Sequence, residues 1–280
     1  MSQINLGCRM TYDVRQRTVF QFQIAAVSTP HQQITQEQFY LSPYVPLETF
    51  LSGMEGNRIH RVVLLPCQLE ISYSATAFLT PIVDAPEQVG ETEASQMPPD
   101  VLTYLNPSRY CESDLLGRFA FEEFGQLYPG FSRVQAICNW VFDHLDYTPG
   151  STTGTTTATD VLLQRAGVCR DYAHLAITLC RGLGIPARYV AGFAVNLNPP
   201  DFHGFFEAYL GGRWYLFDPT RLACVDGLVR IGVGRDAADV SFATLNGESI
   251  LTSKDVWATQ VTNDSNPSGT PVDLQAVTTA

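Results

Sequence analysis

The sequence predicts an α+β protein of two domains, in which an antiparallel β-sandwich precedes a core of helices packed on an antiparallel sheet. Three observations support this fold class. The first third alternates apolar and polar residues, which is typical of half-buried strands. The middle carries apolar stripes at helical spacing, and Gly211-Gly212 then joins two apolar runs. We place the sandwich at residues 1–95, the core at 96–262 and a flexible tail at 263–280.

The N-terminal third is expected to consist of strands. Ile4 to Tyr12 alternates strictly, and Phe20 to Ile24 does the same. The polar residues Arg15 to Arg17 lie between these runs, so a β-hairpin is expected. Further strands are expected at Gln38–Ser42, Arg58–Leu65 and Leu69–Ala77. Because this third gathers no catalytic residue types, we expect a scaffold or a substrate-docking module rather than a separate activity.

A linker and helices are expected next. Residues 81–100 are rich in proline, acidic and small polar residues, which indicates a linker with a domain boundary near residue 95. Ser113 to Phe124 is predicted to be a helix. Ser132 and Gln135 match a capping box, and an apolar stripe runs from there to Leu145, which predicts a second helix. Tyr147-Thr-Pro-Gly150 ends that helix.

Cys169 falls at the start of a further predicted helix, Cys169 to Leu183, whose apolar residues recur at three- and four-residue steps. Gly167 breaks the chain just before it. The N-terminus of a helix offers unpaired N–H groups and a partial positive charge. Both favour the thiolate, which is the nucleophilic form of cysteine.

The Gly211-Gly212 pair predicts a β-hairpin between His203–Leu210 and Arg213–Phe217. With a two-residue turn, Leu210 faces Arg213, and Phe205 faces Asp218. His203 then shares a face of the sheet with Asp218 and lies about two residues away on the neighbouring strand. At ~5 Å between strands the carboxylate reaches the imidazole, so the hairpin alone predicts a contact between His203 and Asp218.

A thiol, an imidazole and a carboxylate match the nucleophile, base and orienting residue of covalent acyl transfer. The backbone N–H of Cys169 is a candidate oxyanion donor, and Tyr147 or Trp140 is a candidate side-chain donor. Each residue has a structural alternative, because a lone cysteine near a helix start is more often buried packing than a nucleophile. His174 lies off the Cys169 face of the helix, so packing is expected for it. A metal site from Cys169, His174, His203 and Asp218 matches no compact ligand motif, so no metal is expected.

Composition limits the other functions. The net charge is −11, from 17 Lys and Arg against 28 Asp and Glu, which argues against binding nucleic acid or anionic membrane. Neither a signal peptide nor a membrane-length apolar run is evident. The seven cysteines are irregularly spaced and indicate a reducing, cytoplasmic setting without disulfides, in which all except Cys169 are expected to be buried.

Three blocks of this sequence resemble the transglutaminase-like superfamily, in its bacterial branch related to papain-like cysteine peptidases. They are Gly167-Val-Cys-Arg-Asp-Tyr-Ala-His174, Ala187-Arg-Tyr-Val-Ala-Gly-Phe193, and His203-Gly-Phe-Phe-Glu-Ala-Tyr209 with Trp214-Tyr-Leu-Phe-Asp-Pro-Thr220. The resemblance covers about residues 130–225, and the β-rich first third is similar to the domain that precedes such cores in bacteria. It implies a papain/transglutaminase-like core.

The resemblance implies that Cys169 is the nucleophile, His203 the base and Asp218 the third member of a triad. The family usually has alanine and tryptophan after the histidine, whereas this chain has Gly204 and Phe205. No calcium site of the animal enzymes has a counterpart, and no cofactor is implied. We therefore expect thiol-dependent acyl transfer on peptide or isopeptide amides of a peptide or protein substrate. Hydrolysis is favoured because nothing visible excludes water; the alternatives are a glutamine–amine cross-linking transglutaminase and a non-catalytic binding module.

Overall fold

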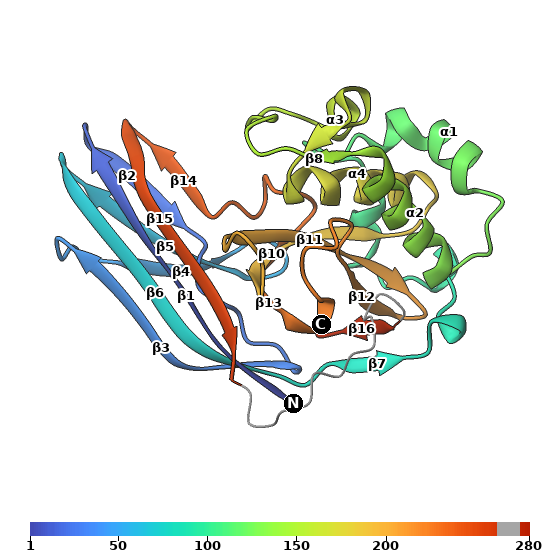
Figure 1. The fold of residues 1–280 in the computed structure, drawn as a ribbon, viewed down its shortest axis with the longest axis horizontal. Coiled ribbons are helices and arrows are strands. Elements are labelled where there is room, and N and C mark those ends of the chain that lie inside the picture. The colour runs from blue at the N-terminus through green and yellow to red at the C-terminus, as the bar shows by residue number, and fades with distance from the viewer. Residues whose placement is uncertain (262–274) are drawn as a thin grey trace.

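The computed structural model describes residues 1–261 and 275–280. It has two lobes, one built of long strands and one in which helices cover a sheet (Figure 1). This mixed arrangement confirms the predicted fold class. In the described parts of the chain, each helix is too short or too polar to cross a membrane.

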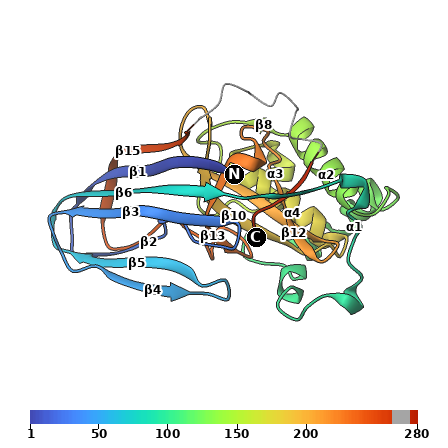
Figure 2. The same ribbon diagram turned by 90° about the horizontal axis from the view of Figure 1, so that it is seen from below.

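The strand lobe is a sandwich of two antiparallel four-stranded sheets, one above the other in Figure 2. The even-numbered residues of β1 from Ile4 to Val14 are buried and pack with apolar residues of β2 and β5 from the other sheet, as alternation requires. The first sheet has the order β15 (Ser249–Gln260), β1 (Ser2–Val14), β6 (Cys67–Leu79) and β3 (Gln32–Ser42). The second has the order β14 (Ala243–Asn246), β2 (Thr18–Phe22), β5 (Asn57–Leu64) and β4 (Glu48–Ser52).

The hairpin predicted between the first two strands is wrong. β1 pairs with β6 and β15, whereas β2 pairs with β5 and β14 in the other sheet. The chain crosses between the sheets at Arg15–Arg17. The apolar faces therefore meet across the sandwich, where the rings of Tyr12 and Phe20 lie 5.2 Å apart. Alternation satisfied by face-to-face packing looks the same in sequence as alternation within a hairpin.

The limits of the core also differ from the predicted range 96–262. β14 and β15 lie within that range but complete the two sheets of the sandwich, so the chain returns to its first lobe near residue 243. Of the predicted tail, residues 263–274 lie outside the described residues. Ala276–Thr278 forms β16, which pairs with β7 (Ile82–Asp84) and is buried, so these residues are not loose.

The second lobe packs helices on a sheet of the order β12, β11, β10 and β13. The strands are β10 (Ala187–Ala194), β11 (Phe202–Leu210), β12 (Arg213–Phe217) and β13 (Leu228–Gly234). The helices are α1 (Ser113–Phe124), α2 (Phe131–His144), α3 (Ala158–Gln164) and α4 (Cys169–Gly182). β8 (Asp146–Tyr147) and β9 (Ala166–Gly167) form a short parallel pair beside α4.

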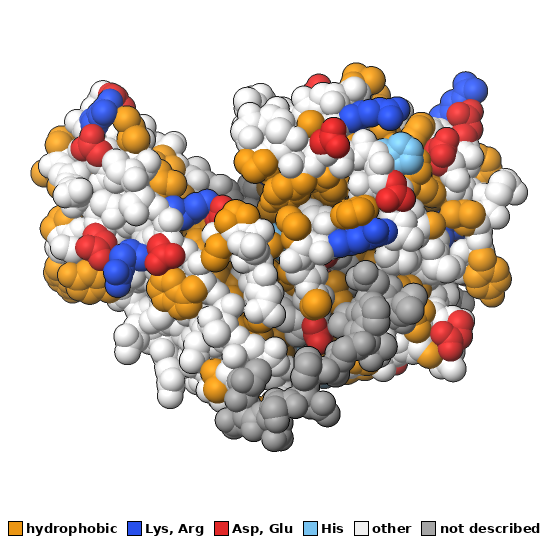
Figure 3. Space-filling model, viewed as in Figure 1, with side chains coloured by type: hydrophobic (Ala, Val, Ile, Leu, Met, Phe, Trp, Pro, Cys, Tyr) orange, Lys and Arg blue, Asp and Glu red, His pale blue; other side chains and the backbone are white. Residues whose placement is uncertain are grey.

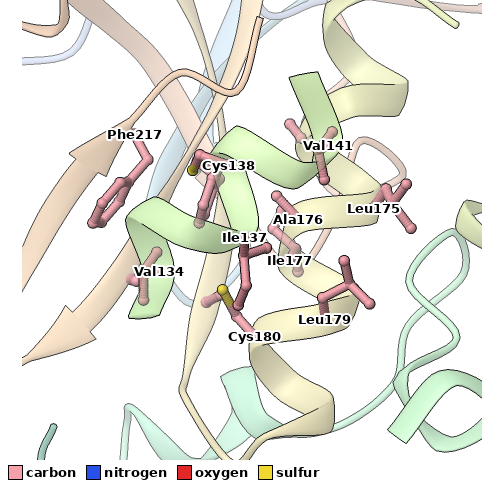
Figure 4. Packing of buried hydrophobic residues seen from close by; sticks show 14 of the residues in the cluster. Val134, Ile137, Cys138, Val141, Leu175, Ala176, Ile177, Leu179, Cys180 and Phe217 are labelled. Atoms are coloured by element: carbon pink, nitrogen blue, oxygen red, sulfur yellow. The ribbon is translucent and has the colours of Figure 1, made fainter. Parts of the chain in front are cut away.

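Helix α4 is the centre of this lobe, and its residues from Asp171 to Arg181 are all buried. Its apolar side chains meet those of α2 and the end of β12 in one cluster (Figure 4). The contributing residues include Val134, Ile137, Cys138 and Val141 of α2, Leu175, Ala176, Leu179 and Cys180 of α4, and Phe217 of β12. The cluster fixes the position of the α4 N-terminus relative to the β11–β12 hairpin.

The predicted capping box on α2 is wrong. α2 begins at Phe131 after Gly130, and the Ser132 hydroxyl donates to the carbonyl of Tyr128 instead. Gly130 has a φ of 115° and its amide is bound by Glu91. A capping box is present on α3, where the Thr157 hydroxyl accepts from the Asp160 amide.

The predicted linker is ordered along the surface of the helical lobe. It contains β7 and the short 3-10 turns Pro86–Gln88 and Ala94–Gln96, and further turns occupy Leu102–Leu105 and Val225–Gly227. Val89 is buried, and its carbonyl accepts from the Phe131 amide. The linker thereby fixes the start of α2.

Buried charges join the two lobes. Glu207 on β11 is fully buried and pairs with Arg188 on β10 and Arg230 on β13. Arg188 also pairs with Glu55 of the sandwich, and the Gln32 side chain of β3 bonds the backbone of Arg230. Because removal of one partner would leave a buried charge uncompensated, this network holds the lobes in one arrangement. A hollow remains between their upper parts (Figure 3).

Candidate active site

Cys169 is the first residue of α4. Val168 before it is extended, with a φ of −119°, so the helix begins sharply at the thiol. The Cys169 side chain is partly exposed, whereas Cys8, Cys111, Cys138 and Cys180 are buried. Cys67 and Cys224 are also accessible to different degrees, so the expectation that six cysteines are buried is wrong for these two. No disulfide joins any of the seven.

The β11–β12 hairpin has the predicted register. Leu210 pairs with Arg213, and Phe206 pairs with Phe217. The turn residues Gly211 and Gly212 have φ values of 54° and 84°, which glycine adopts without strain. The register brings His203 and Asp218 together, and His203 Nε2 lies 2.8 Å from Asp218 Oδ2.

Asp218 is held by the turn that follows β12. Its Oδ1 accepts from the backbone N–H of Thr220 at 3.0 Å and from the Thr220 hydroxyl at 2.7 Å. Its Oδ2 also accepts from the Ala223 backbone N–H at 3.2 Å. These donors fix the orientation of the Asp218 side chain, so that its Oδ2 can accept from the imidazole N–H of His203. The sequence pattern did not indicate these donors, because they depend on the shape of one turn.

His203 interacts with both Asp218 and the Cys169 thiol. Nε2 is bound to Asp218, and the buried Nδ1 has no hydrogen-bond partner. Burial disfavours the charged ring, but Asp218 and then the Cys169 thiol outweigh burial and raise the pKa of His203 from 6.5 to about 10. The arrangement therefore favours an imidazolium beside the thiol at neutral pH.

Tyr147 lies beside the thiol at the end of β8. Its hydroxyl interacts with both the backbone N–H and the side chain of Cys169. Burial and the proximity of Cys169 raise the pKa of Tyr147, so its hydroxyl stays protonated and able to donate. Of the two candidate side-chain donors, Tyr147 is the one that the structure places at Cys169.

Trp140, the other candidate oxyanion donor, packs in the contact between α1 and α2. Its ring stacks on His144 at 4.0 Å and meets Phe119 and Phe124 of α1 edge-on at 5.4 and 6.2 Å. The residue fills the contact between α1 and α2. Trp140 lies off the apolar stripe of α2, on the face that α1 covers.

His174 has a packing role, as helix geometry predicts. It is buried, its ring stacks on Tyr110 at 5.1 Å, and its Nε2 accepts from the Ala237 backbone N–H. Burial lowers the pKa of His174 to about 3, so the ring is neutral. Among residues 1–261 and 275–280, no group of three or more His, Cys, Asp or Glu side chains could hold a metal ion.

Gly204 and Tyr189 form a pair that sequence reasoning missed. A Cβ on Gly204 would lie 2.4 Å from the Tyr189 hydroxyl oxygen, so this hydroxyl occupies the space of an alanine side chain beside His203. Tyr189 is buried in β10, and burial followed by the nearby Cys169 raises its pKa. The only signal in the sequence was the glycine itself, which departs from the family pattern.

Comparison with known proteins matches both lobes. Residues 122–219 match the family model of the transglutaminase-like superfamily, and residues 3–100 match the bacterial transglutaminase N-terminal domain. A crystal structure of a proposed cysteine protease from Cytophaga hutchinsonii is 39% identical with a TM-score of 0.94, over 99% of this chain and 96% of that one.

Curated relatives include uncharacterized proteins of Mycobacterium. One from Mycobacterium leprae is 37% identical over 120 residues, which are 39% of this chain and 42% of that protein. One from Mycobacterium tuberculosis H37Rv is 32% identical over 151 residues, which are 49% of this chain and 48% of that protein. The chain thus spans less than half the length of these relatives. Both domain matches and the full-length structural match agree, and the chain belongs to the transglutaminase-like superfamily.

Proposed function

We propose that this protein transfers acyl groups from peptide or isopeptide amides through a Cys169 thioester, with water as the preferred acceptor. The observation that carries the proposal is the position of His203, which is bonded to Asp218 through Nε2 and interacts with the Cys169 thiol. An imidazole held in this way takes the thiol proton, and Asp218 stabilises the resulting cation.

The first half-reaction forms the thioester. The Cys169 thiolate attacks the amide carbonyl, and a C–S bond forms as the carbonyl electrons move to oxygen. The Cys169 N–H and the Tyr147 hydroxyl donate to that oxyanion, supported by their proximity in the structure. His203 then donates its proton to the leaving nitrogen, the C–N bond breaks, and the amine departs.

The second half-reaction releases the acyl group. His203 accepts a proton from water, and the oxygen attacks the thioester carbonyl. The C–S bond breaks, the carboxylic acid departs, and Cys169 regains its proton. An amine in place of water would give an amide by the same steps, so the acceptor decides between hydrolysis and cross-linking.

Alkylation tests the nucleophile. With iodoacetamide at pH 6 to 7, we expect Cys169 to react at least about tenfold faster than the exposed Cys224, because the His203 imidazolium lies beside the Cys169 thiol. His203→Ala should remove this advantage. Peptide mass spectrometry of quenched samples measures both rates in one reaction, and equal rates in the wild type would overturn the proposal.

A glutamine peptide and a labelled amine test the acceptor. Hydrolysis predicts ammonia release and a glutamate product without amine incorporation. Incorporation of the amine at a rate comparable to hydrolysis would contradict the preference for water and would identify the activity as a transglutaminase. The Cys169→Ala variant is the blank for both products.

A further inference from the structure

We propose that Asp171 is a positioning residue that, through Thr152, holds the Tyr147 hydroxyl against the Cys169 N–H. The inference rests on the proposed function, since it assigns the residue that builds the oxyanion site. Asp171 itself does not touch the reacting atoms. Its role is to join the loop that carries Tyr147 to the start of α4.

The Asp171 carboxylate is fully buried and bound from three sides. Its Oδ2 accepts from the Val168 backbone N–H at 2.9 Å and from the Thr152 hydroxyl at 2.6 Å. Its Oδ1 accepts from the Arg170 guanidinium at 3.0 and 2.8 Å. One side chain thus binds the residue before Cys169, the residue after it and a residue of the distant loop.

Two neighbours make this arrangement possible. A Cβ on Gly167 would lie 2.7 Å from the Asp171 Cβ, so only glycine lets the carboxylate turn back under Val168. Arg170 donates to the Thr153 carbonyl at 2.9 Å as well as to Asp171. The Arg170 cation therefore binds the same loop and also pairs with the buried Asp171 carboxylate.

The chain is consequently attached to the start of α4 both before and after Tyr147. Before it, β8 pairs with β9, so that Tyr147 lies opposite Gly167, and the Thr148 amide donates to the Gly167 carbonyl at 2.9 Å. After it, residues 148–150 are exposed, and Thr152 is the point where the chain returns to α4. Loss of the Thr152 bond leaves the loop after Tyr147 attached through Arg170, which donates to the Thr153 carbonyl, and through the Tyr110 hydroxyl, which donates to the Gly154 carbonyl further along.

The consequence is specific to oxyanion stabilisation. Acylation needs the Tyr147 hydroxyl within about 3 Å of the developing oxyanion, and a misplacement of ~1 Å can cost up to about a hundredfold in rate. Alkylation by iodoacetamide passes through no carbonyl oxyanion. A change in Thr152 should therefore slow acylation and leave alkylation unaffected.

Thr152→Val removes only the hydroxyl and keeps the shape. We expect the acylation burst of Cys169 with p-nitrophenyl acetate to slow by about tenfold, while its alkylation rate stays within about twofold. Thr152→Ser restores the hydroxyl and should recover the burst. Thr155→Val is the matched control, because the exposed Thr155 hydroxyl bonds the Thr153 hydroxyl within the same loop.

A double variant tests the route through Tyr147. Tyr147→Phe should slow the burst, and adding Thr152→Val should cause little further loss, since the hydroxyl being positioned is already absent. Three results would overturn the inference while leaving the proposed function intact. They are a burst in the double variant slowed by the product of the two single losses, an unchanged burst in Thr152→Val, and an alkylation rate of Thr152→Val that falls as much as its burst. A wild type with neither a burst nor selective alkylation would instead sink the proposed function, and the inference with it.

Discussion

Two segments of this protein have similar sequence patterns and opposite structures. At 4–24 and at 203–217, two apolar runs are joined by a few polar or small residues. The second pair is a hairpin, whereas the first pair separates into the two sheets of the sandwich. The difference lies in the connection, because Gly211-Gly212 adopts two consecutive positive φ values, and Arg15-Gln16-Arg17 adopts none. A turn with specific backbone demands sets a register, and polarity alone does not.

The largest expected effect concerns packing across the sandwich. Phe20→Ala should lower the free energy of unfolding by about 3–5 kcal/mol, since the ring is fully buried against Tyr12 of the other sheet. Urea denaturation measures the change. A loss below about 1 kcal/mol would contradict face-to-face packing of these strands.

Disrupting the hairpin turn should lower the free energy of unfolding somewhat less than Phe20→Ala does, but it should change the reactivity of Cys169 more. Replacing both Gly211 and Gly212 with valine should cost about 2–4 kcal/mol, because each L-residue is strained at positive φ. The selectivity of Cys169 alkylation should fall with it, as the His203–Asp218 register loosens. Gly211→Asn is the control, since asparagine tolerates this conformation; stability retained in the double valine variant would show that the turn does not set the register.

The contact between Gly204 and Tyr189 should have an intermediate effect on the free energy of unfolding. Gly204→Ala forces the Tyr189 hydroxyl away from its position and should cost about 1–3 kcal/mol. In a Tyr189→Phe background the alanine should fit, so the double variant should recover most of that loss. Additive costs would mean that the two residues do not share this space.

The smallest effect should come from the first connection. One glycine inserted between Gln16 and Arg17 should change the free energy of unfolding by less than about 1 kcal/mol, because both residues are exposed and no hairpin register depends on this segment. Cys169 alkylation should be unchanged. A loss as large as that of the double valine variant would remove the contrast between the two connections.

The sequence was sufficient where structure depends on local rules. The helix from Cys169, the Gly-Gly turn and the contact between His203 and Asp218 follow from periodicity, turn chemistry and register. It was insufficient where distant segments compete. No local sequence pattern predicted that β14 and β15 return to the sandwich or that α1 covers Trp140. Nor did one predict that Gly130 rather than Ser132 precedes α2. Thr220 and Asp171 depend on loops whose shape only the folded chain defines.

The pH dependence of Cys169 alkylation in the wild type and in Asp218→Asn tests the central claim most directly. The folded-state pKa of His203 is raised from 6.5 to about 10, so the stability gained from its charged form is full below about pH 6.5 and is lost as pH rises through about 10. Asp218→Asn removes the carboxylate that supports this charge. We predict that Cys169 of the wild type is alkylated faster than Cys224 at pH 6, and that Asp218→Asn lowers the Cys169 rate there by at least about tenfold. Identical pH profiles in the two proteins would contradict the triad.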